Sequence, residues 1–98
     1  MSIAGRESNN RAIVTVLGSD RPGIVAAVAG ALAAHDANIL DISQTILQGV
    51  FTMTMLIDLG DANVVFSELQ DEFTTLSQEL GVQTTMQREE VFKYMYRL

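Results

Sequence analysis

The chain has 98 residues, which is enough for one domain with a single apolar core and too few for two ordinary domains. It contains no cysteine, which excludes disulfides, thiolate metal sites and a cysteine nucleophile. Twelve acidic residues against six basic ones give a net charge of −6, which argues against nucleic-acid binding. No apolar run approaches the roughly 20 residues of a membrane-spanning helix and no signal peptide is visible, so we expect a cytoplasmic protein without membrane partners.

The first half of the chain predicts a strand followed by a helix. Residues 1–10 are polar and predict a flexible N-terminal segment. Residues 12–17 are rich in β-branched side chains and predict a buried strand. Apolar residues at helical spacing after Pro22 predict a helix over residues 22–35. Within this helix, Gly30 favours close packing against a neighbouring element.

The middle of the chain predicts a β-hairpin. Residues 39–47 and 50–59 have the composition of strands, and Gln48-Gly49 between them is typical of a tight turn. The second strand alternates, so that one face is half polar and the other is apolar, with Phe51, Met53, Met55, Ile57 and Leu59. We therefore expect the apolar face to be covered by helices and the other face to remain open.

The last third of the chain predicts a second helix, a short strand and a tail. Apolar residues three and four positions apart predict a helix over residues 66–80, and Gly81 is typical of the residue that ends a helix. Residues 82–87 alternate and predict a strand. Residues 88–98 form a tail whose apolar spacing predicts a short helix.

The order of these elements predicts the fold class. Strand, helix, strand, strand, helix, strand is the order of the ferredoxin-like βαββαβ plait, an α+β fold in which a four-stranded antiparallel sheet carries two helices on one face. We expect three parts in the chain: a flexible segment over 1–10, the domain over 11–87 and the C-terminal tail over 88–98.

Few residues suggest catalysis or metal binding. The only histidine, His35, lies at the end of a predicted helix, where a favourable interaction with the helix C-terminus is a better explanation than a ligand role. Adjacent acidic pairs at 71–72 and 89–90 point in different directions on a helix and are expected on solvated faces. Glu89 and Lys93 have the spacing of an ion pair. We expect no enzymatic activity, no metal and no cofactor.

The loop before the first helix is more informative. Gly23 lies at the predicted helix start, where exposed N–H groups can bind a carboxylate. Asp20 can accept a hydrogen bond from an ammonium group, and Arg21 can donate hydrogen bonds to a carboxylate. The loop therefore complements a free α-amino acid. The alternative is that Pro22 and Gly23 only shape a tight turn, with Asp20 as its cap. The residues of the loop by themselves leave both explanations open.

Two short motifs resemble a known family. The sequence DRPGI at 20–24, followed 14 residues later by NILDI at 38–42, resembles the ACT domain, a small ligand-binding regulatory module of amino-acid and nucleotide metabolism. The resemblance covers about residues 11–87. The short length and the basic, aromatic tail resemble the stand-alone single-ACT proteins of the UPF0237 type, and the ACT units of the glycine cleavage repressor are also similar.

The resemblance implies a site for a small ligand and a second domain beside it. ACT domains that bind amino acids usually hold the ligand at a contact between two domains, and pairs of domains often form a continuous eight-stranded sheet. Gly18 stands where the serine-sensing members carry histidine, which argues against serine. Carried onto matching positions, the ligand-binding residues are Asp20, Arg21, Pro22, Gly23, Ile24, Asn38 and Ile39.

We therefore expect a cytoplasmic, non-catalytic sensor that binds a small metabolite, with an amino acid as the first class to test, near the interface of a homodimer or higher homo-oligomer. The alternative is a protein-interaction or dimerisation module without a small-molecule ligand, docking on a partner enzyme or regulator, with the tail at 88–98 as one contact. A third interpretation is a small enzyme, because Gln48-Gly49-Val50 resembles the QGV motif of acylphosphatases. The catalytic arginine of that motif is missing here.

Overall fold

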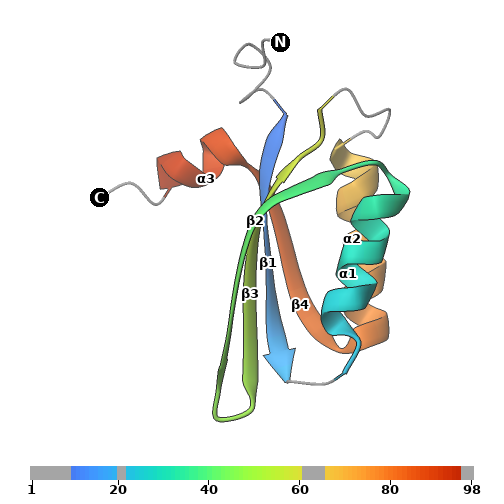
Figure 1. Ribbon diagram of the computed structural model, residues 1–98, viewed down its shortest axis with the longest axis vertical. Coiled ribbons are helices and arrows are strands. Elements are labelled where there is room, and N and C mark those ends of the chain that lie inside the picture. The colour runs from blue at the N-terminus through green and yellow to red at the C-terminus, as the bar shows by residue number, and fades with distance from the viewer. Residues whose placement is uncertain (1–9, 20–21, 61–65, 96–98) are drawn as a thin grey trace.

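A computed structural model describes residues 10–19, 22–60 and 66–95 of the chain. The elements follow the predicted βαββαβ order, and the short helix predicted for the tail follows the last strand (Figure 1). They are β1 (Arg11–Ser19), α1 (Ile24–Ala34), β2 (Asn38–Leu47), β3 (Val50–Asp58), α2 (Phe66–Leu80), β4 (Val82–Arg88) and α3 (Glu89–Met95).

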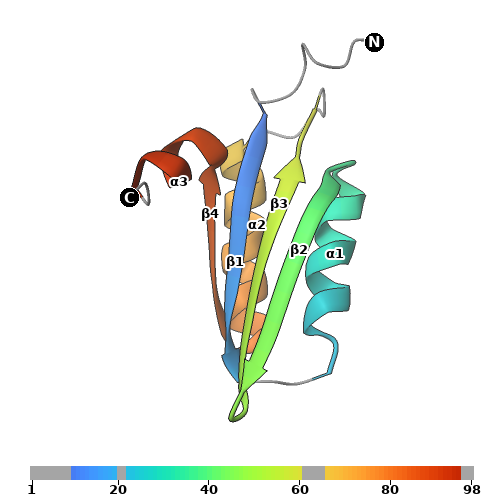
Figure 2. The same cartoon turned by 60° about the vertical axis from the view of Figure 1, so that its left-hand side comes forward.

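The four strands form one antiparallel sheet in the order β2-β3-β1-β4. The strands β1 and β3 are therefore central, and β2 and β4 form the two edges. Both long helices lie on the same face of the sheet, with α1 near the β2 side and α2 near the β4 side (Figure 2). The predicted ferredoxin-like plait is confirmed.

The core lies between the sheet and the two long helices. The alternation predicted for β3 is confirmed, because every second residue from Phe51 to Leu59 is buried. Cross-strand register places Val14 of β1 opposite Met55 on one side and Met86 on the other, so the three strands present their apolar residues to the same face. The helices complete this core with Ile24, Val28, Ala31, Leu32, Leu69 and Phe73.

Two turns have the conformations that the sequence predicts. Gln48 and Gly49 both have positive φ, 51° and 82°, which is the pattern of the two-residue turn that matches the twist of a β-hairpin. Gly81 ends α2 with φ of 71°, and its N–H donates to the carbonyl of Ser77 at 2.9 Å.

The expectation for Gly30 is wrong within this chain. Gly30 is exposed, and a Cβ placed on it would meet no atom within 4 Å, so it mediates no close packing here. The glycine that does permit a close approach is Gly18, where a Cβ would lie 2.7 Å from Cγ1 of Val82 on the neighbouring strand. Helical periodicity does not report on this contact, because two strands of the sheet make it.

The expectation of a solvated Glu89-Glu90 pair is also wrong for one of its members. Glu89 opens α3 and is only 8% exposed. Its Oε2 lies 3.2 Å from Nη2 of Arg11 in β1 and 3.5 Å from Nζ of Lys93, which confirms the predicted pair with Lys93. The helix α3 turns back onto β1 and β4, and this places Glu89 over the sheet instead of in solvent.

Candidate functional site

The loop between β1 and α1 carries most of the predicted site. Asp20 and Arg21 lie outside the described residues. Pro22 and Gly23 are exposed, and Ile24, the first residue of α1, is 1% exposed and packs into the core. The helix therefore starts two residues later than predicted, because Gly23 has a left-handed conformation that cannot belong to the helix.

Gly23 is the N-cap of α1. Its φ is 91°, and its carbonyl accepts the first helical hydrogen bond from the N–H of Ala27 at 2.9 Å. A glycine has no side chain to cap the helix, and the first turn of α1 contains no acidic residue. Within the described residues, the first N–H groups of the helix are thus left without a side-chain acceptor. Such groups and the positive end of the helix dipole together favour an anion.

The space in front of Gly23 is open. A Cβ at this position would meet no atom within 4 Å, so glycine is needed for its positive φ and not to avoid a clash. This supports the turn-shaping role of Gly23 that the sequence left open. It is also compatible with a ligand, since the same conformation keeps the helix terminus accessible.

Asn38 and Ile39 lie at the other end of α1. The chain enters α1 at Gly23, runs the length of the helix and turns into β2 at Asn38 (Figure 1). The 11 residues of α1 correspond to about 16 Å of helix. Asn38 is exposed, and Ile39 is half-buried opposite Ile57. One chain therefore does not bring the two motifs of the predicted site together.

The edge strand β2 exposes apolar side chains that the sequence did not single out. Ile42 and Ile46 pair with Met55 and Phe51 and so share the helix-covered face, yet they are 40% and 57% exposed. The hairpin extends past the ends of the helices, so its outer half has no cover in the chain (Figure 1). The β2 patch, as we name it, consists of the exposed apolar residues along this edge, Leu40, Ile42, Ile46, Leu47 and Val50 of β3. Leu47 and Val50 pair with each other and lie on the opposite, open face of the sheet.

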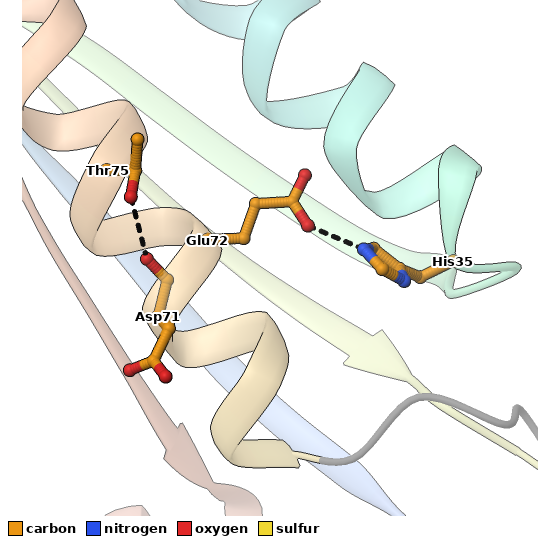
Figure 3. Close-up of polar contacts among 4 residues, drawn as sticks. All are labelled: His35, Asp71, Glu72 and Thr75. Atoms are coloured by element: carbon orange, nitrogen blue, oxygen red, sulfur yellow. Dashed lines mark hydrogen bonds and ion pairs between the residues drawn. The ribbon is translucent and has the colours of Figure 1, made fainter.

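His35 joins the end of α1 to α2. Its Nε2 lies 2.5 Å from Oε1 of Glu72, while Asp71, the neighbour of Glu72, points away from this contact (Figure 3). Adjacent acids on this helix thus have different directions, as predicted. A specific partner on α2 adds to the helix-terminus role that we expected for His35. In the described part of the chain, no three His, Asp or Glu side chains gather as metal ligands.

No helix in the described ranges is long and apolar enough to cross a membrane.

The model of the ACT domain family matches residues 10–87. A UPF0237 protein from Methanopyrus kandleri is 50% identical over 88 residues, which cover 90% of this chain and 98% of that protein.

Solved structures give the same assignment. An ACT domain protein from Streptococcus pneumoniae is 42% identical with a TM-score of 0.74, over 88% of this chain and 97% of that one. A putative glycine cleavage system transcriptional repressor is 26% identical with a TM-score of 0.69, over 80% of this chain and 44% of that one. The protein described here belongs to the ACT domain family and is similar over almost their full length to the UPF0237 proteins.

Proposed function

We propose that this protein is a non-catalytic cytoplasmic sensor that binds an amino acid at the N-terminus of α1, beside a contact between two copies of the chain. The ACT domain is a regulatory fold, which supports a sensing role over a catalytic one. The observation that carries the proposal is the start of α1 at the exposed Gly23, where no side chain of the described residues caps the helical N–H groups.

The chemistry of the loop fits a zwitterion. The α-carboxylate of an amino acid would accept hydrogen bonds from the helix terminus, where the dipole favours negative charge. Arg21, on the same loop, supplies a guanidinium for that carboxylate, and Asp20 supplies an acceptor for the ammonium group. The sequence from Pro22 to Gln87 contains no lysine or arginine, so Arg21 is the guanidinium nearest in sequence to the helix terminus.

A second copy of the chain would complete the site. Gly23 and Asn38 lie at opposite ends of α1 in one chain. If two β2 edges pair antiparallel, the second β2 runs in the reverse direction and carries its Asn38 toward the end of the sheet where Gly23 lies. The same pairing would cover the β2 patch and remove an exposed sheet edge. The proposed ligand site therefore depends on the proposed dimer, and ligand binding and oligomeric state can be measured separately.

Thermal unfolding with each of the twenty amino acids tests the ligand. A ligand present at 100 times its dissociation constant stabilises the folded state by about 2.7 kcal/mol. For a domain of this size this corresponds to a rise in Tm of about 10 °C. Asn38→Ala is expected to abolish the shift while leaving the unliganded Tm unchanged, because Asn38 is exposed. Gln44→Ala, on the same edge strand, is the matched control and should retain the shift.

The second candidate function is an interaction module without a small-molecule ligand. The β2 patch favours it, because uncovered apolar side chains on an edge strand can bind a protein partner regardless of the loop. Absence of a shift with every amino acid, or equal shifts in wild type and Asn38→Ala, would favour this second function over the first.

A further inference from the structure

The outer side of β4 forms a groove with α2. This groove is far in sequence from the loop that contains Gly23, and it lies at the opposite edge of the sheet from β2. The groove has a volume of about 360 Å³, within the range of roughly 300–1,000 Å³ that ligand sites occupy. Residues 84–87 of β4 line one wall. The other wall belongs to α2 and consists of Gln70, Asp71, Phe73 and Thr74.

Main-chain groups of β4 face this groove. The side-chain amide of Gln70 donates to the carbonyl of Met86 at 2.9 Å. In an antiparallel pair the main-chain groups alternate between the two sides of a strand, so a carbonyl that points to α2 is not bonded to β1. The main-chain groups of Thr84, two residues earlier, face the same way. The β4 edge thus offers main-chain N–H and C=O groups with which a further strand can pair. The side chain of Gln70 already bonds one of these groups, the carbonyl of Met86, as a partner strand would.

The helix beside the groove is acidic. Four acids lie on α2 and no base does, and the sequence from Pro22 to Gln87 contains neither lysine nor arginine. The carboxylate of Asp71 has no hydrogen-bond or ionic partner within the described ranges, and it points away from the contact between His35 and Glu72 (Figure 3). The nearest base on β4 is Arg88, whose guanidinium lies 4.5 Å over the ring of Phe66. Asp71 is therefore the charged residue that lines the groove, and no lysine or arginine of the described ranges lines it.

We propose that this groove binds an extended basic segment of a partner protein, which adds to β4 as a further strand and directs a lysine or arginine toward Asp71. Main-chain pairing with an exposed edge provides affinity that does not depend on sequence, and the charged side chain provides selection. The acids along α2 would also speed the approach of a basic partner. This surface is separate from the proposed amino-acid site, so either proposal can fail without the other.

A peptide titration followed by ¹⁵N–¹H NMR tests the proposal. The probe is the acetylated, amidated peptide Thr-Val-Lys-Val-Thr. We expect its addition to shift the amide signals of residues 70–74 and 83–87. The same peptide with glutamate in place of lysine should bind more weakly, and a version N-methylated at alternate residues should not bind, since methylation removes the donors that pair with β4. Equal binding of all three peptides, or signals that move only in β2, would overturn the proposal.

A pair of variants tests the role of Asp71. Asp71→Asn is expected to weaken the lysine peptide about threefold, the effect of losing one exposed ion pair, and to leave the glutamate peptide unchanged or tighter. Glu79→Gln changes the charge of the same helix by the same amount outside the groove and should leave the affinity unchanged. Equal weakening by both variants would show that only the net charge of α2 matters. It would contradict the proposed contact between Asp71 and the lysine of the peptide. Free lysine that moves the same signals with the same affinity would show that no strand is recognised.

Discussion

The two edges of the sheet differ in what they expose. The β2 edge presents apolar side chains, with Leu47 exposed to 70% and Ile46 to 57%, and no helix covers its outer half. The β4 edge presents threonine and glutamine, lies beside the acidic helix α2, and has one carbonyl already bonded by Gln70. An uncovered apolar edge favours a permanent partner such as a second copy, whereas a polar edge with its own side-chain cap is suited to a reversible contact. The β2 edge is therefore suited to the proposed dimer contact and the β4 edge to the proposed peptide contact.

The largest expected effect is loss of the dimer when the β2 patch is charged. Ile42→Lys with Ile46→Lys should turn the proposed dimer into a monomer at micromolar concentration, because two ammonium groups from each copy would be buried unpaired between the subunits. Sedimentation velocity measures the change. Gln78→Lys with Gln83→Lys adds the same charge at exposed positions near the β4 side and should leave the dimer intact. A wild-type monomer would contradict the assignment of β2.

The second effect concerns the contact between β1 and β4. Gly18→Ala places a methyl group 2.7 Å from Cγ1 of Val82, and the strands must separate to accept it. Overpacking of this kind is expected to lower the free energy of unfolding by about 1–3 kcal/mol, measured by denaturant titration. A change in the free energy of unfolding near zero would instead show that β4 can shift away from β1 at little cost.

The third effect concerns the cap on the β4 edge. Gln70→Ala removes the donor to the carbonyl of Met86 and is expected to cost about 1 kcal/mol, the value of one hydrogen bond, in the same titration. Gln78→Ala, on an exposed part of the same helix, is the matched control and should change stability by a few tenths of a kcal/mol at most. Equal effects of the two variants would show that the bond contributes no net stability.

The smallest effect has the opposite sign. Gly30→Ala should stabilise the fold by about 0.5–1 kcal/mol, because Gly30 lies in the interior of α1 and a Cβ there has open space. Thermal unfolding of the two proteins at equal concentration provides the measurement. A loss of stability that grows with protein concentration would instead place Gly30 against a second copy of the chain.

Much of the fold follows from local patterns in the sequence. Apolar spacing predicts α2 and its end before Gly81, alternation predicts the buried face of β3, and Gln48-Gly49 predicts the hairpin turn. These predictions succeed because each depends on residues that are close in sequence and on a period that one secondary structure imposes.

The candidate site follows from the sequence less completely. The motif at residues 20–24 and the asparagine at 38 can be recognised by resemblance, and Gly23 of the first motif is the exposed N-cap of α1. The separation of Gly23 from Asn38 by the length of α1 is not visible in the motifs themselves. The groove beside β4 has no motif at all, since it depends on which strand lies at the edge.

The sequence by itself determined the elements, their order and the family, because those depend on periodicity and on short motifs. The tertiary structure decided that Glu89 is buried against Arg11, that Gly18 rather than Gly30 allows a close approach, and that the two sheet edges have different chemistry. Each of these depends on contacts between residues far apart in the chain, and long-range contacts are set by packing and register, which no local pattern encodes.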